Sequence, residues 1–131
     1  EERTSEEIRK LQSAGVHVIA SFHNFDRTPD REELIRRLTR MQEMGADVAK
    51  IAVMPQSRED VMTLMEATME ADHSLDIPVV TISMGRLGVL SRLAGTLTGS
   101  AMTFASVGEA SAPGQIPIEQ MKVFCQLLSM K

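Results

Sequence analysis

Side chains with four different chemistries occur at or just after four successive strand-like segments of this sequence. They are the amine of Lys50, the imidazole of His23, the guanidinium of Arg92, and the hydroxyl and amide of Ser111 and Gln115. A neutral amine can attack a carbonyl carbon to form a Schiff base, and an imidazole can move protons near neutral pH. A guanidinium can bind a carboxylate. Together these groups are typical of a Schiff-base enzyme that acts on a small anionic carbonyl compound.

Lys50 interrupts the apolar run DVAKIAVM, which has the composition of a strand. Side chains alternate between the two faces of a strand, so Val48, Ala52 and Met54 share the face of Lys50. Lysine is rarely buried, and burial favours the neutral amine over the ammonium. We therefore expect a buried Lys50 that can act as a nucleophile. The strand pattern equally allows a structural lysine that reaches solvent or pairs with a carboxylate.

The other polar residues also admit ordinary structural roles. His23, in FHNFDRTP after the first strand, is either a proton shuttle or a loop histidine with local hydrogen bonds. Arg92, in the helix after the third strand, is either a bidentate carboxylate ligand or a solvated helix arginine. Ser111 and Gln115 either donate hydrogen bonds to a polyol or belong to an ordinary loop before a helix. No His, Cys, Asp or Glu cluster has the spacing of a metal site, so we predict no metal.

Helical and strand-like segments alternate along the chain. Strands are predicted at residues 16–21, 47–54, 77–84 and 100–107, and helices at 1–14, 28–45, 57–72, 88–97 and 117–129. The strands are nearly continuous in hydrophobicity and are separated by helix-length segments, so they should be parallel and joined by helical crossovers. The predicted class is α/β. An open doubly wound sheet and half of a (β/α)8 barrel both fit this order, and both gather the polar residues at the carboxyl ends of the strands.

The composition limits the remaining choices. A chain of 131 residues with 43% hydrophobic residues suits one domain, and its net charge of −4 argues against a nucleic-acid partner. No apolar run approaches the ~20 residues of a membrane helix, and no signal-peptide pattern occurs. The single cysteine, Cys125, cannot form an internal disulfide, which suits a reducing compartment. We expect a cytoplasmic protein without a membrane or nucleic-acid partner.

Five stretches resemble the type I 3-dehydroquinate dehydratases of the shikimate pathway: SFHNFDRTP, ADVAKIAVMPQS, TISMGRLGVLSRLAG, GSAMTF and ASAPGQI, in the family's order. The family fold is a (β/α)8 barrel, and the chain resembles its second half, so the resemblance implies a single parallel half-barrel domain over residues 1–131. Ile82 stands where some members have methionine, a conservative change. The resemblance implies roles for eight residues: Lys50 as the Schiff-base lysine, His23 as the general acid/base, Arg92 as the carboxylate ligand, Ser111 and Gln115 in a lid loop, and Phe25, Met84 and Phe104 as apolar pocket residues.

The implied reaction removes water from 3-dehydroquinate to give 3-dehydroshikimate, with no external cofactor or metal. The part of the family that precedes the first helix here, with a glutamate and arginines of the same pocket, is missing. Three explanations stay open: a piece of a longer enzyme, a short half-barrel that pairs with a second copy or a separate partner, and a non-catalytic binding or assembly module. We expect low activity from residues 1–131 alone and association into a homodimer.

Overall fold

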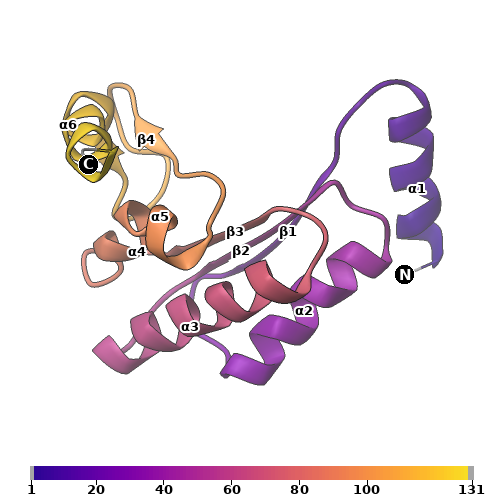
Figure 1. The fold of residues 1–131 in the computed structure, drawn as a ribbon, viewed down its shortest axis with the longest axis horizontal. Coiled ribbons are helices and arrows are strands. Elements are labelled where there is room, and N and C mark those ends of the chain that lie inside the picture. The colour runs from indigo at the N-terminus through magenta and orange to yellow at the C-terminus, as the bar shows by residue number, and fades with distance from the viewer. Residues whose placement is uncertain (1, 130–131) are drawn as a thin grey trace.

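The computed structural model describes residues 2–129 and shows a parallel sheet with helices packed against it (Figure 1). The elements in chain order are α1 (Glu2–Ser13), β1 (Ile19–Asn24), α2 (Arg31–Glu43), β2 (Val48–Val53), α3 (Arg58–Ser74), β3 (Val79–Ser83), α4 (Val89–Leu93), α5 (Gly95–Thr98), β4 (Ala105–Ser106), β5 (Ile116–Pro117) and α6 (Ile118–Ser129). The predicted α/β class with parallel strands is confirmed. The described residues form no closed barrel.

The main sheet has the strand order β1–β2–β3, and both pairings are parallel. In the register, Ser21 of β1 lies beside Lys50 of β2. Two residues further along, His23 lies beside Ala52, which lies beside Ile82 of β3. Because side chains alternate in direction along a strand, both rows project from the same face of the sheet.

Helices α2 and α3 cover the other face of the sheet (Figure 1). Each helix begins at a capping side chain: Asp30 accepts a hydrogen bond from the Glu33 N–H, and Ser57 accepts one from the Asp60 N–H. Burial of apolar area here stabilises the sheet from one side and fixes where its strands lie. The core under these helices consists of Leu34, Leu38, Met41, Ala49, Ile51, Val53, Leu64, Ala67, Ala71 and Val79.

The face opposite the helices is only partly covered. Ala52, Ile82 and Met84 form a small buried cluster at the β2–β3 side. On the edge strand β1, the residues of the same face, Ser21 and His23, are exposed. Polar side chains can therefore stand on this face without being sealed in the core.

The first strand begins three residues later than predicted, at Ile19 rather than at residue 16, and it continues through Asn24. The carboxylate of Asp47 accepts a hydrogen bond from the Val18 N–H at 2.7 Å. This side-chain bond takes the place of a backbone partner for the Val18 N–H, and regular strand geometry begins at the next residue. At the other end the strand continues through Asn24, so His23 lies within β1 and not in the loop after it.

The fourth strand, predicted at residues 100–107, is wrong for most of its length. Within that range, strand geometry is confined to Ala105–Ser106, which pairs with Ile116–Pro117 and not with β3. The Ala101 N–H does donate to the Val79 carbonyl at 2.8 Å. The next donor along β3, the Thr81 N–H, instead bonds to the Ser100 hydroxyl at 3.1 Å, so the backbone ladder does not continue.

The helix predicted at residues 88–97 is divided into α4 and α5. The break lies at Ala94, which ends α4 and precedes Gly95, a residue of low helix propensity. The helices predicted at 1–14, 28–45, 57–72 and 117–129 are confirmed to within three residues at each end. Among residues 2–129, no helix is both long and apolar enough to cross a membrane.

Candidate active site

One pocket of about 240 Å³ on the open face of the sheet is lined by all eight residues predicted for the site. Strands β1 and β2 position two of these residues, His23 and Lys50, which project from adjacent rows of the same face of the sheet. The loops after β1 and β3 and the loop before β5 supply others. The structure thus brings together His23, Phe25, Lys50, Met84, Arg92, Phe104, Ser111 and Gln115.

The amine of Lys50 lies against the imidazole of His23. Lys50 Nζ is 3.4 Å from His23 Nε2, at the long end of hydrogen-bond range. The same amine stands 5.1 Å from the ring centre of Phe104, within the range of a cation–π contact. Lys50 is half-buried and not buried as expected, because its face of β2 opens into the pocket. The amine can therefore reach a ligand in the pocket.

The imidazole of His23 is held by its own strand. Ser21 Oγ lies 3.1 Å from His23 Nε2, and Phe25 meets the ring edge to face with centroids 5.9 Å apart. Partial desolvation, and after it the positive charge of Lys50, lower the pKa of His23 below its usual value. The neutral imidazole, which can accept a proton, is therefore the favoured form at neutral pH.

Arg92 is a buried arginine and not a solvated one, since 3% of its surface is exposed. It stands on α4, and its Nη2 donates to the Pro113 carbonyl at 2.9 Å. Its Nε and Nη1 are buried and have no hydrogen-bond partner among residues 2–129. Burial lowers the pKa of the Arg92 guanidinium below its usual value. Unpaired buried donors on a cation favour an anionic ligand.

The loop from Ser111 to Gln115 lies over the pocket and is held by backbone contacts. The Pro113 carbonyl accepts a second hydrogen bond from the Gly85 N–H at 3.1 Å. Gly114 has φ +78°, and a Cβ on it would come within 2.4 Å of the Gly85 carbonyl oxygen. Glycine is therefore required for the loop to approach this closely.

The side chains of Ser111 and Gln115 bond to each other across this loop. Gln115 Nε2 donates to Ser111 Oγ at 3.0 Å, and the backbone N–H of Ser111 donates to Gln115 Oε1 at 2.8 Å. A polyol ligand would have to compete with these bonds for the same donors. Both residues still line the pocket, so the two side chains lie within reach of a bound molecule.

Three further lining residues were not predicted as site residues: Ala52, Ile82 and Ala112. The alternation of strand side chains had already put Ala52 on the face of Lys50, and the register of β2 against β3 puts Ile82 beside Ala52. Ser21 was missed for another reason. The predicted strand ended at residue 21 and left His23 in a loop, which hid the fact that the two share a face.

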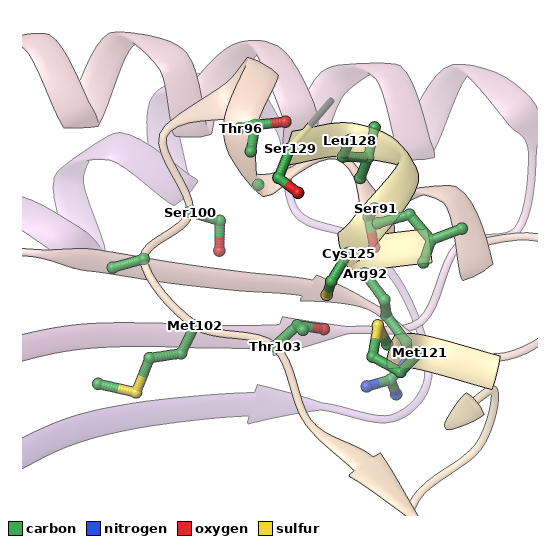
Figure 2. Close-up of a pocket in the computed structure, with 13 residues that line it drawn as sticks. Ser91, Arg92, Thr96, Ser100, Met102, Thr103, Met121, Cys125, Leu128 and Ser129 are labelled. Atoms are coloured by element: carbon green, nitrogen blue, oxygen red, sulfur yellow. The ribbon is translucent and has the colours of Figure 1, made fainter. Parts of the chain in front are cut away.

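A larger cavity of about 330 Å³ lies between α5, residues 100–103 and α6 (Figure 2). Its walls are mostly apolar and include Met102, Met121 and Cys125. Arg92 contributes to both cavities, but neither Lys50 nor His23 lines this one. The smaller pocket is the candidate active site, because it holds the amine, the imidazole and the guanidinium together.

The part of the chain that the structure describes holds no group of three or more His, Cys, Asp or Glu residues that could bind a metal ion. The pocket chemistry is that of a nucleophilic amine, a proton carrier and an anion ligand. Such a set can activate a carbonyl compound that carries a carboxylate.

The pattern of a known family runs through the whole chain. The model of the family described as type I 3-dehydroquinase matches residues 1–131. The chain belongs to the type I 3-dehydroquinase family. The 3-dehydroquinate dehydratase of Geobacillus thermodenitrificans is 56% identical over 116 residues, which cover 88% of this chain and 45% of that protein. That of Klebsiella pneumoniae subsp. pneumoniae is 52% identical over 123 residues, which cover 93% of this chain and 49% of that protein.

About half of each of two solved 3-dehydroquinate dehydratase structures superposes closely on this chain. The 3-dehydroquinate dehydratase of Geobacillus kaustophilus matches 97% of this chain with a TM-score of 0.94 and 46% identity. The Clostridium difficile enzyme, described with covalent modified comenic acid, matches 95% with a TM-score of 0.91 and 46% identity. The match covers 49% of the first of these chains and 50% of the second. The chain thus spans about half the length of the relatives it matches.

In this type I 3-dehydroquinase chain, replacing Lys50 with Met should raise the pKa of His23. The substitution removes the positive charge that helps to lower the pKa of His23. Methionine has an unbranched side chain of nearly the same length as lysine, so the packing is preserved. The pKa should stay below the usual value for histidine, because desolvation is the larger cause. The measurement is an NMR titration of the His23 ring with pH.

Lys10→Met is the matched control, because Lys10 lies on α1 and does not line the pocket. It removes the same charge from the chain and should leave the pKa of His23 unchanged. Equal pKa values for His23 in the parent and in Lys50→Met would contradict the electrostatic contact.

Proposed function

We propose that the whole protein is a Schiff-base dehydratase that converts 3-dehydroquinate to 3-dehydroshikimate. The observation that carries this proposal is the position of Lys50 Nζ, 3.4 Å from His23 Nε2, in a pocket shared with Arg92. Membership of the type I 3-dehydroquinase family and relatives named 3-dehydroquinate dehydratase support the reaction. The covalent modified comenic acid of the Clostridium difficile relative supports covalent chemistry in this family.

The amine of Lys50 would attack the ketone carbon of the substrate. The ketone oxygen leaves as water, with one proton from the amine and one relayed from solvent through His23, and a cationic iminium remains. The iminium withdraws electrons from the neighbouring carbon and makes its proton easier to remove, which is the task that a cofactor would otherwise perform. The protein's own side chains therefore suffice for the activation.

His23 would then move the proton of the elimination. Neutral Nε2 takes the proton α to the iminium carbon, and the iminium becomes an enamine. The enamine electron pair forms the new carbon–carbon double bond and expels the β-hydroxyl, which leaves as water with the proton from His23. A second water hydrolyses the iminium, releases the unsaturated ketone and restores the Lys50 amine. The net change is the loss of one water from the substrate.

The remaining residues would position the substrate. The unpaired Nε and Nη1 of Arg92 suit its carboxylate, because a buried cationic donor gains a charge-assisted hydrogen bond from an anionic oxygen. Ser111 and Gln115 suit its hydroxyl groups. The apolar walls at Phe25 and Met84, together with Phe104, would limit water around the reacting carbons.

We also propose that residues 1–131 form a single domain that is half of a (β/α)8 barrel. Both helices that connect the strands of the main sheet lie on one face, as in a barrel, whereas a doubly wound sheet has helices on both faces. The opposite face is open at β1, whose outer edge pairs with no strand among the described residues. A complementary half of the barrel, or a second copy of this chain, would cover it.

Exposed apolar side chains support such a partner. Phe25 is 59% exposed at the pocket, and α6 exposes Val123, Phe124 and Leu127. Apolar surface of this kind is typical of an interaction site. A partner over these surfaces would also remove water from the pocket, which strengthens the electrostatic contacts of Lys50 and Arg92.

Borohydride reduction in the presence of 3-dehydroquinate should add ligand mass to the peptide that contains Lys50. The chain is prepared together with the part of the Geobacillus kaustophilus enzyme that it does not match, so that the pocket is complete. Lys50→Ala should abolish the added mass, because the amine that forms the iminium is gone. Mass spectrometry of the digested protein identifies the labelled residue.

Lys122 on α6 is the internal control for this experiment, because it forms an ion pair with Glu119 outside the pocket. It should stay unlabelled in the parent and in the variant. Labelling of another lysine at parental yield in Lys50→Ala would contradict the assignment and, with it, the Schiff-base mechanism.

Arg92→Lys should weaken the binding of 3-dehydroquinate about ten- to a hundredfold, measured by calorimetry on the same assembly. A lysine keeps the charge but has no second donor at the angle that a carboxylate requires. The matched control is Arg86→Lys, because Arg86 is exposed in the loop before α4 and does not line the pocket. Equal loss of binding in both variants, or equal binding of a substrate analogue without the carboxylate, would contradict this role of Arg92.

Residues 1–131 alone should associate and should turn over 3-dehydroquinate poorly. Association buries the exposed apolar surface, and poor turnover follows because an open pocket hydrates Lys50 and misplaces the substrate. Light scattering gives the mass in solution, and the enone absorbance of the product gives the rate.

Turnover should rise when the complementary half is added. Full turnover by a monomer would contradict the half-barrel proposal. Association without borohydride trapping, even with the complementary half present, would favour the alternative of a non-catalytic assembly module.

A further inference from the structure

Ser21 lies on the open face of the sheet, next to both His23 and Lys50. It lies two residues before His23 on β1, so both side chains leave the same face of the strand. It also lies beside Lys50 in the parallel register. The ring of His23 leans back along the strand, and its Nε2 comes within 3.1 Å of Ser21 Oγ and 3.4 Å of Lys50 Nζ.

These two contacts compete for a single ring position. A neutral imidazole nitrogen has either one N–H or one lone pair, so Nε2 either donates or accepts. The amine of Lys50, when it carries its full set of protons, can only donate. The hydroxyl of Ser21 can do both, because it has one proton and two lone pairs. Ser21 can therefore stay bonded to Nε2 in either protonation state of the ring.

We propose that Ser21 is a positioning residue for His23, whose hydroxyl holds Nε2 beside Lys50 and presents it as a proton acceptor. With Ser21 and Lys50 both donating to Nε2, the neutral ring keeps its proton on Nδ1. The lone pair of Nε2 is then directed at the side of the pocket where the amine lies, and it becomes free when the Ser21 O–H rotates away.

The proposal rests on the proposed function for its consequence in catalysis. The Ser21 O–H first rotates away and frees the lone pair, Nε2 then takes the α-proton of the substrate, and the imidazolium N–H donates to Ser21 Oγ. When the proton passes to the departing hydroxyl, the Ser21 O–H turns back and donates to Nε2. The ring is held in place through both transfers, and no proton is gained or lost by Ser21.

The test compares Ser21→Thr with Ser21→Val in residues 1–131. The two replacements have nearly the same shape and both suit a strand, but valine has no hydroxyl. Ser21 is exposed, so neither replacement has to fit a closed core. The readout is the tautomer ratio of His23 in chains labelled with ring-15N histidine, with the His23 signals assigned by His23→Gln.

In the parent and in Ser21→Thr, the Nδ1–H tautomer of neutral His23 should predominate. In Ser21→Val, and in Ser21→Ala, the ratio should differ from that of Ser21→Thr by about two- to tenfold, the usual effect of one hydrogen bond. Ser13→Ala, at the end of α1, removes a hydroxyl outside the site and should leave the ratio unchanged. The same ratio in Ser21→Thr and Ser21→Val would overturn the proposal.

A second readout uses the assembled protein. Ser21→Val should lower kcat and leave KM near the parental value, because the hydroxyl acts on the proton transfer and does not line the pocket. Ser21→Thr should restore kcat. The tautomer ratio can be measured without substrate. If the ratio shifts but borohydride trapping fails, the proposed function is wrong and the hydrogen bond from Ser21 to His23 still stands. If Lys50 is trapped but the tautomer ratio is unchanged, only the proposed role of Ser21 is wrong.

Discussion

The parallel register of β1 against β2 is the constraint on which the site depends. It puts Ser21 beside Lys50 and carries His23 to the same face. A slip of one residue would turn every side chain of β1 to the opposite face. Phe22 opposes such a slip, because it packs into the core under α2 and its ring lies 3.8 Å below the Arg37 guanidinium. Packing on the helix side thus sets the chemistry on the pocket side.

Local patterns in the sequence were enough to predict the elements whose stability is local. The helices follow from apolar spacing and caps such as Ser57, and β2 and β3 follow from their apolar runs. The errors lie where one distant side chain decides a boundary. Asp47 binds the Val18 N–H before β1, and Ser100 binds the Thr81 N–H beside β3. A single residue type in a sequence does not reveal such a partner.

In the candidate site, too, local sequence predicted only part of what the structure shows. The chemical character of Lys50, His23 and Arg92 followed from residue type and from their places near strand ends. The burial of these side chains could not be predicted in this way. Lys50 is less buried than an apolar strand suggests, because its face opens to a pocket, and Arg92 is more buried than most helix arginines, because the loop at Pro113 closes over it. The burial of a side chain depends on segments that are distant in the sequence, so it could be determined only from the structure.

The close approach of Gly114 to Gly85 limits how the mouth of this pocket can be redesigned. At Gly114 even a methyl group would meet the Gly85 carbonyl oxygen, so the loop cannot be diversified at its closest point without being lifted off the sheet. Lifting it would also separate the Pro113 carbonyl from Arg92. A library that aims at a wider range of ligands should therefore keep Gly114 and vary Ala112, a lining residue of the same loop.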